Sequence, residues 1–219
     1  MPSNQLTEEE VELLVTYMCE RLIDHHSVQP PALYALLALS GSKNFVNGLA
    51  SRICRIIFQN VHNQSLSQTD RCNVYTIFAR FLESRIEELK QMEADFVLGF
   101  IQAMDTEKDP RNLVLCFQCA RTIILNFSLA NFAEEMFEVT SCYFPIDFTP
   151  PPNDAYKITR DDLIKGLRGC LSATEKFGEF AYPLLLEKLT SDIPSAKLDS
   201  LQTLGECVEI YGIKHLREF

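Results

Sequence analysis

The sequence is short of the features that mark several large protein classes. Its 219 residues include only eight glycines and ten prolines, too few for a disordered or collagen-like chain. No apolar run approaches the roughly 18–20 residues that a membrane span requires. The first ten residues, MPSNQLTEEE, have neither the basic nor the apolar region of a signal or transit peptide. We therefore expect a folded protein that does not contact a membrane.

Positive charge is also scarce. Twenty lysines and arginines stand against thirty aspartates and glutamates, which gives a formal net charge of −10. Nucleic-acid binding is driven largely by basic side chains that displace counterions from phosphates, and this chain has no block of five or six basic residues. Direct binding of nucleic acid is therefore not expected. The acidic surface is interpreted mainly as a source of solubility, with attraction of basic protein partners as the alternative.

Sequence motifs of catalysis are missing as well. The chain has no nucleophile elbow, no P-loop, no G-x-G-x-x-G and no H-E-x-x-H. The adjacent carboxylates Asp161 and Asp162 are interpreted as favourable charge at a helix start, not as a catalytic pair. We expect no catalytic residue and no enzymatic activity.

Eight cysteines occur at irregular spacings, and without a secretory signal they predict reduced thiols in the cytoplasm or nucleus. Cys116 and Cys119 form a C-x-x-C, for which cluster ligation is one reading and apolar packing within a helix is the other. A cluster usually takes four ligands, and no neighbouring cysteines complete the set. A metal site from His25, His26 and Cys19 is a further alternative. The expectation is no metal and no cofactor.

Apolar residues recur at helical spacing along almost the whole chain and predict an all-α fold. Val11, Val15 and Leu22 illustrate one such face, together with Leu14 and Met18. The expected units are about five antiparallel helix pairs, at 7–40, 43–92, 94–127, 129–176 (with an insertion at 145–158) and 179–212. No domain boundary is evident, so residues 1–219 are expected to form a single array.

Helix ends follow from the same pattern. The predicted helices within the later pairs are 43–61, 70–92, 94–104, 110–127, 129–143, 159–173, 179–189 and 194–211. Two capping boxes are expected, from Thr7 with Glu10 and from Thr159 with Asp162. Asp109 is expected to cap a helix that begins at Pro110, because the first helical position needs no amide donor.

An internal repeat indicates the fold class. An offset of 84 residues places Phe96 on Phe180 and Pro110 on Pro194. The same offset places Val114, Phe117, Ala120 and Ile124 on the apolar set of the last helix, which is expected to face inward: Leu198, Leu201, Leu204 and Val208. Because 84 is twice 42, the unit has the size of a HEAT or armadillo helix pair. The prediction is an α-solenoid, in which neighbouring pairs complete each other's core. An irregular helical bundle is the alternative.

Several segments resemble one known family, the HEAT-repeat targeting adaptor of the cytosolic iron–sulfur protein assembly machinery, also described as a nucleotide-excision-repair and transcription factor. The clearest are 142–171 (CYFPIDFTPPPNDAYKITRDDLIKGLRGCL) and 195–204 (SAKLDSLQTL). Segments 65–75, 94–112 and 134–144 also resemble its N-terminal region. Members are several times longer than this chain, so the resemblance implies an N-terminal portion of such a protein.

The resemblance also implies a role. Such adaptors bridge assembly subunits to apoproteins that need clusters, among them DNA helicases and polymerases, in the cytoplasm and nucleus. The family's contacts with assembly partners are generally ascribed to C-terminal repeats, which would lie outside this chain. The alternative function is a generic HEAT scaffold, such as a transport or transcription-complex subunit. In both cases the expected partners are proteins.

One segment, 145–158, is not required by helix packing. Its run of prolines favours an extended conformation, and its charges and Phe148 could contact a partner. The candidate interaction residues are Asp147, Phe148, Pro150, Pro151, Pro152 and Asp154. The alternative is a rigid spacer folded against its own repeat.

Overall fold

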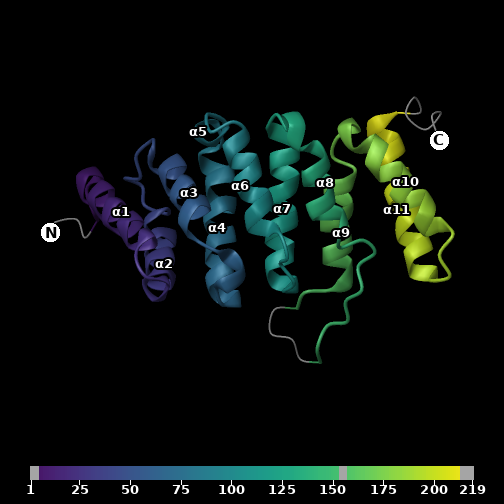
Figure 1. Cartoon of the computed structure of the whole chain (residues 1–219), viewed down its shortest axis with the longest axis horizontal. Coiled ribbons are helices and arrows are strands. Elements are labelled where there is room, and N and C mark those ends of the chain that lie inside the picture. Colours follow the sequence, from purple (N-terminus) through teal and green to yellow (C-terminus); the bar gives the residue numbers. More distant parts are fainter. Residues whose placement is uncertain (1–4, 153–156, 213–219) are drawn as a thin grey trace. The chain divides into compact units, whose positions relative to one another are not determined.

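The computed structural model describes residues 5–152 and 157–212, apart from the side chain of residue 130, and all regular elements in these ranges are helical (Figure 1). The α-helices are α1 (Glu8–Ile23), α2 (Gln29–Leu39), α3 (Leu49–Asn60), α4 (Gln68–Ser84), α5 (Ile86–Lys90), α6 (Ala94–Met104), α7 (Pro110–Asn126), α8 (Ala133–Ser141), α9 (Arg160–Leu171), α10 (Gly178–Leu189) and α11 (Pro194–Tyr211). Short 3₁₀ turns are η1 (His26–Val28), η2 (Asn63–Ser65), η3 (Ala130–Phe132) and η4 (Glu175–Phe177). The predicted all-α, HEAT-type class is confirmed. No helix in the described ranges is long and apolar enough to span a membrane.

The chain divides into two compact units, unit 1 (Met1–Asn112) and unit 2 (Leu113–Phe219). The division falls in the first turn of α7. The single array expected over 1–219 stays a prediction.

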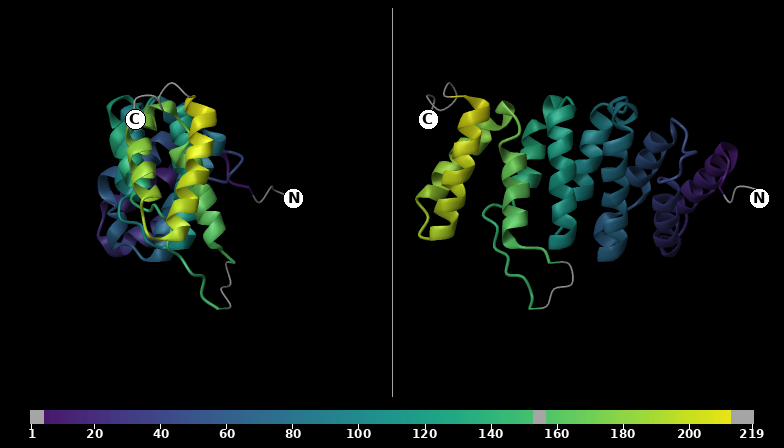
Figure 2. Two further views of the ribbon diagram at one scale, coloured as in Figure 1. Left: turned by 90° about the vertical axis from the view of Figure 1, so that its right-hand side faces the viewer. Right: turned by 180° about the vertical axis from the view of Figure 1, so that it is seen from behind.

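Unit 1 is built from two layers of helices (Figures 1 and 2). The first helices of successive pairs, α1, α3 and α6, pack in order, and α2 packs against both α1 and α4. Aromatic rings fill the space between pairs: the Phe78 centroid lies 5.2 Å from that of Phe58 and 6.3 Å from those of Phe96 and Phe100. Such ring pairs each add about 0.5–1.5 kcal/mol beyond the burial of their area. Each pair therefore depends on its neighbour for a complete core.

Buried amides connect successive pairs in unit 1 at the turn between their two helices. Gln29 donates from Nε2 to the carbonyls of Leu22 and Asn60, each at 2.9 Å. Asn63 of η2 donates from Nδ2 to the carbonyl of Ala103, also at 2.9 Å. The last carbonyls of a helix have no partner within the helix, and these amides supply one for α3 and α6. The turn of one pair thus donates a hydrogen bond to the C-terminal end of the first helix of the next pair.

The turn between α6 and α7 is joined to the preceding pair by an ion pair instead of an amide. The Glu107 side chain is fully buried and accepts two hydrogen bonds from Arg71, at 2.7 and 3.0 Å. It also accepts from the amides of Lys108 and Asp109 and from Asn112 Nδ2, all at 2.9 Å. Burial alone raises the pKa of this carboxyl, but the hydrogen bonds from Arg71, Asp109 and Asn112 outweigh it and hold the pKa below its usual range.

In unit 2 the second helices of the last two pairs, α9 and α11, pack against each other, and they pack against the first helices α8 and α10 respectively. Two glycines bring α9 close to α7. A Cβ at Gly166 would lie 3.2 Å from the ring of Phe117, and a Cβ at Gly169 would lie 3.2 Å from the side chain of Arg121. Larger residues at these positions would push α9 away from α7.

The predicted helix starts are confirmed at three places. Thr7 with Glu10 and Thr159 with Asp162 form capping boxes. Asp109 accepts from the amide of Arg111 at 3.0 Å, and α7 begins at Pro110. The repeat register holds as well, since α10 and α11 begin 84 residues after α6 and α7.

Three predicted helices are wrong in extent. The helix expected from residue 43 begins at Leu49, because Gly48 takes a left-handed φ of 92°. The helix expected over 70–92 is interrupted at Arg85 (φ −137°), whose guanidinium donates to the carbonyl of Phe45 at 2.6 Å. The helix expected over 129–143 is divided between η3 and α8, which ends at Ser141.

The face expected to be buried on α11 is also wrong. Leu198 and Leu201 are 54% and 57% exposed, and Leu204 and Val208 are half-buried. The residues that α11 buries against α10 and α9 are Ala196, Asp199, Ser200, Thr203, Cys207 and Tyr211. On α7 the residue 84 positions before Leu201 is Phe117, which α9 covers. The described part of the chain has no helix after α11 to cover the corresponding face.

The ion pair of Arg71 with Glu107 predicts a large stability effect. Arg71→Met should lower the free energy of unfolding by about 3–5 kcal/mol at pH 7, because it leaves a buried carboxylate without its cation. Urea unfolding followed by circular dichroism measures this. Arg55→Met, at an exposed position of α3, is the matched control and should change the value by less than about 0.5 kcal/mol. Equal effects of the two substitutions would contradict the assignment.

The same carboxyl predicts a pH dependence. The pKa of Glu107 is lower in the folded state than in the unfolded chain, where it is about 4.3. Its stabilisation is therefore present above about pH 4.3 and is lost as the pH falls through the folded pKa. The stability difference between the unsubstituted chain and Glu107→Gln should shrink when urea unfolding is repeated from pH 6 down to pH 3. A difference that is constant over this range would rule out the effect.

Candidate protein-interaction surfaces

The segment after α8 is attached to unit 2 at its start. Ile146 is buried among Phe144, Ile164 and Leu167. Arg160, at the first position of α9, donates from Nε to the carbonyl of Ile146 at 3.0 Å and from Nη2 to Asp199 of α11 at 2.8 Å. One guanidinium therefore holds the base of the insertion to two helices.

The residues proposed for interaction lie beyond this attachment. Asp147, Pro150, Pro151 and Pro152 are exposed, and Phe148 is half-buried. From Asp147 to Pro152 the segment leads away from the helices (Figures 1 and 2). Asp154 lies outside the described residues. The structure thus shows contact with its own repeat at Ile146, and partner binding by the exposed residues stays a prediction.

A groove of about 510 Å³ lies along the second helices of unit 2. α7 contributes a polar and apolar wall that includes Leu125, which is 56% exposed. α9 contributes its two glycines and Lys165, and α11 contributes Glu206. The full lining is Val114, Phe117, Gln118, Arg121, Thr122, Leu125, Asp162, Lys165, Gly166, Gly169 and Glu206. The groove is therefore formed by residues from three successive repeats.

The charges of this groove are mixed. Arg121 and Lys165 are opposed by Asp162 and Glu206. Glu206 is oriented by Arg168, at 3.5 Å, and by the hydroxyl of Ser172, at 3.3 Å. A surface with both signs suits a protein segment with polar and apolar side chains better than a uniformly anionic nucleic-acid backbone. Sequence reasoning missed this groove, although the G-L-R-G spacing in α9 was a usable signal of close helix packing.

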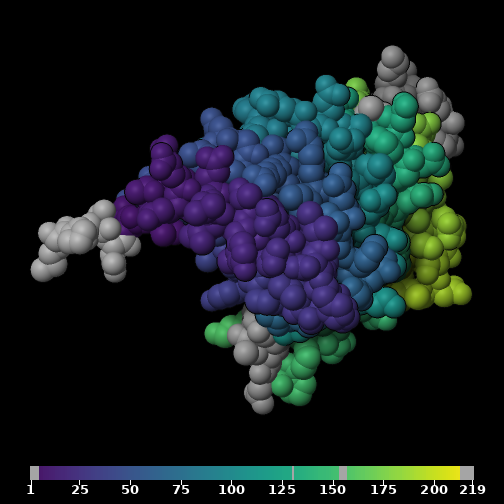
Figure 3. All heavy atoms as spheres, turned by 60° about the vertical axis from the view of Figure 1, so that its left-hand side comes forward, coloured from purple at the N-terminus to yellow at the C-terminus, as the bar shows by residue number. Residues whose placement is uncertain are grey.

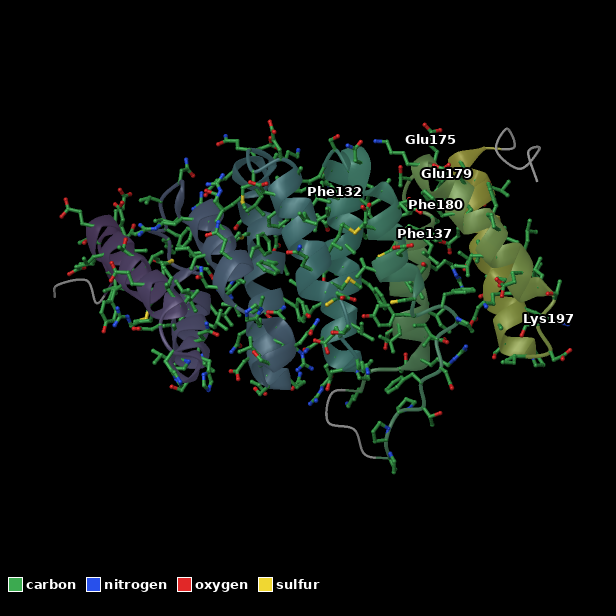
Figure 4. The ribbon with its side chains drawn as sticks, in the orientation of Figure 1. Phe132, Phe137, Glu175, Glu179, Phe180 and Lys197 are labelled. Carbon is green, nitrogen blue, oxygen red and sulfur yellow. The ribbon has the colours of Figure 1, made fainter. Side chains whose placement is uncertain are left out.

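A second surface of unit 2 combines aromatic rings with carboxylates. Phe137 of α8 lies 5.4 Å from Phe177 and 5.6 Å from Phe180, measured between centroids. Phe137, Phe180, Glu175 and Glu179 gather at one end of α8 and α10, Phe132 lies to one side of them, and Lys197 lies apart on α11 (Figure 4). Phe132 and Phe180 are half-buried and both glutamates are exposed. This end of unit 2 is both apolar and acidic.

In unit 1 the helices α1 and α2 present an uncovered surface (Figure 3). Leu13, Tyr17 and Tyr34 are 69%, 51% and 68% exposed. The Arg21 guanidinium carbon lies 5.0 Å from the Tyr17 ring centroid, so this ring is partly occupied by a cation of its own helix.

The cysteines lie mostly in the core. Cys116 and Cys119 are buried in α7, and burial raises the pKa of the Cys119 thiol to about 12. Burial likewise raises the pKa of Cys170 to about 12, and its thiol donates to the carbonyl of Phe117 at 3.1 Å. A metal ligand must be a thiolate, which these surroundings disfavour. The rings of His25 and His26 contact each other at a tilt of 42°, with centroids 4.0 Å apart. Within the described ranges no three His, Cys, Asp or Glu side chains come together as a metal site.

Comparison with known proteins gives a consistent result. The model of a family described as "Dos2-interacting transcription regulator of RNA-Pol-II" (MMS19_N) matches residues 1–219. The "MMS19 nucleotide excision repair protein homolog" of Xenopus tropicalis is 55% identical over 217 residues, which is 99% of this chain and 21% of the relative. The human protein of that name is 54% identical over 98% of this chain and 21% of its own length. The Dictyostelium discoideum relative is 33% identical over 97% and 19%. The chain thus spans about a fifth of the length of these curated relatives.

The burial of the thiols predicts their reactivity. Under native conditions at pH 8, iodoacetamide should modify the exposed Cys142 first. Cys119 and Cys170 should react at least about 100-fold more slowly, because little thiolate is present and access is blocked. Peptide mass spectrometry over time gives the rates, with the chain unfolded in guanidinium as the control for intrinsic reactivity. Modification of Cys119 as fast as that of Cys142 in the native protein would contradict this description.

Proposed function

The chain belongs to the MMS19 family, and on this basis we propose that it is a protein-binding scaffold that acts in nucleotide excision repair and transcription. More specifically, it contributes to an adaptor that targets cytosolic iron–sulfur cluster assembly to apoproteins such as DNA helicases and polymerases. The names of the relatives support the first statement. The resemblance noted in segments 142–171 and 195–204 supports the second.

The observation that carries the proposal is the groove along α7, α9 and α11. It is formed by the second helices of successive repeats, and Gly166 and Gly169 allow α9 to lie close to Phe117 and Arg121 of α7. Repeat proteins use such continuous helix surfaces to bind partners. Its formation by three helices, its mixed charge and the exposed Leu125 suit an extended protein segment.

We further propose that the chain has no catalytic activity and acts in the cytoplasm and nucleus. Its titratable groups with shifted pKa values support a structural role. Arg71 and Glu107 belong to an inter-repeat ion pair, Asp109 and Asp162 belong to helix starts, and the shifted thiols are in the core. Asp162 also lines the groove, but the pKa of its carboxyl is lowered by its hydrogen bonds with Thr159 at the start of α9.

The proposal is tested by recovering partners on immobilised 1–219 from cell extract, in parallel with the full-length protein. Quantitative mass spectrometry should find cluster-assembly subunits and cluster-dependent enzymes on both. Leu125→Asp should lower their recovery on 1–219 at least about fivefold, because it places a charge in an apolar contact of the groove. The position is exposed, so the unfolding midpoint should not change.

Leu13→Asp is the matched control, since it makes the same change at an exposed position of α1 in the other unit. Loss of partners with Leu13→Asp but not with Leu125→Asp would overturn the groove assignment. Recovery of transport cargo in place of cluster-dependent enzymes would support a generic HEAT scaffold. Recovery of no protein on 1–219 would contradict partner binding by this chain.

A further inference from the structure

Unit 1 contains a cleft that the functions above do not use. It consists of two adjoining hollows, of about 300 and 250 Å³, that share Asn63, Gln64 and Ala103. The cleft lies between the turn η2 of the second pair and helix α6 of the third. All its lining residues are in unit 1.

The first hollow has an apolar floor. Ile57 and Val61 are buried there, and the Phe58 ring lies directly on α6. A Cβ at Gly99 would lie only 2.3 Å from that ring, so only glycine allows the contact. Polar side chains, those of His62, Gln64 and Gln102, form the rim. A hollow of this size and lining suits one apolar side chain.

Asn63 lies between the hollows and has an unused acceptor. The residue is 6% exposed, and its Nδ2 is committed to the carbonyl of Ala103. That carbonyl also accepts from the Tyr75 hydroxyl at 2.8 Å. The Asn63 Oδ1 is buried and accepts no hydrogen bond. Buried acceptors without a partner are rare and unfavourable, so a bound donor would stabilise this site.

The second hollow has its charges already balanced. Arg71 and Glu107 pair with each other, and the exposed Lys108 and Asp105 are of opposite sign. Apart from these charged groups, the amide of Gln64 and the hydroxyl of Thr106 are available to a ligand in this hollow. A ligand with neutral donors and acceptors fits this surface better than a phosphate or a carboxylate.

We propose that this cleft binds an extended peptide segment of a protein partner. One apolar side chain of the segment occupies the first hollow, and an adjacent main-chain N–H donates to Asn63 Oδ1. The following peptide group lies over the second hollow, against Gln64 and Thr106. An apolar pocket next to a main-chain hydrogen bond is how proteins commonly bind extended peptides. The identification of the ligand as a protein rests on the proposed scaffold function, but the site is separate from the groove of unit 2.

The test uses two small peptide mimics and the whole chain. N-acetyl-leucine N′-methylamide carries the apolar side chain and two N–H donors. Its analogue with both nitrogens methylated and a dimethylamide end keeps the side chain but has no N–H. Titration of ¹⁵N-labelled 1–219 with the first mimic should shift the amide signals of Asn63, Gln64, Gly99 and Ala103 along a saturable curve. The N-methylated analogue should bind about tenfold more weakly, because Asn63 Oδ1 then receives no donor.

Two substitutions locate the effect. Ala103→Met fills the space shared by both hollows and should abolish the saturable shifts, with the fold checked by circular dichroism. Ala133→Met, at a half-buried position of α8 in unit 2, is the matched control and should leave them unchanged.

Three results would overturn the proposal: no saturable shift with either mimic, equal affinity for the two mimics, or unchanged binding to Ala103→Met. A saturable response of the same amides to a short-chain phospholipid or to adenosine monophosphate, with none to the peptide mimics, would also overturn it. The titration contains no extract, so its outcome is separate from the recovery of partners through the groove of unit 2.

Discussion

The structure of unit 1 depends on one constraint: each helix pair leaves some of its buried groups to be satisfied by a neighbouring pair. The end of α3 needs Gln29 from the preceding turn, the end of α6 needs Asn63, and the Glu107 carboxylate needs Arg71 from the pair before it. The apolar faces follow the same rule, as the phenylalanines around Phe78 show. Removing one pair would therefore leave both apolar surface and buried polar groups without partners, which links the stability of each repeat to its neighbours.

The two surfaces proposed for binding follow from the same arrangement. Where two successive second helices pack closely, as α9 does on α7 through Gly166 and Gly169, their outer residues form a continuous groove. Where a turn meets the end of the next first helix, as at Asn63 and Ala103, a small cleft remains. Both sites lie on rigid elements, so a partner would bind without much ordering of the chain.

Much of the fold could be predicted because its signals are local. The capping boxes, Pro110 at a helix start and the 84-residue register depend on residues that act within one turn or one repeat. The interruption of the helix at Arg85 could not be predicted, because it depends on a hydrogen bond to the carbonyl of Phe45, forty residues earlier. The prediction that Leu198 and Leu201 of α11 face inward was wrong, because periodicity identifies the apolar face of a helix but not what covers that face. The candidate sites were harder still, since Asn63, Leu125 and Gly169 carry no motif and become significant only through their neighbours in space.

The attachment of the insertion has a practical consequence. Arg160 bonds both the Ile146 carbonyl and Asp199, so the chain is fixed where it leaves the helices. The prolines beyond that point are exposed to solvent and are not part of the core of unit 2. Lengthening a loop whose ends are already fixed costs little entropy, since the cost grows only with the logarithm of its length. This loop is thus a position where a fluorophore, an affinity epitope or a second domain could be inserted while both proposed binding surfaces stay intact.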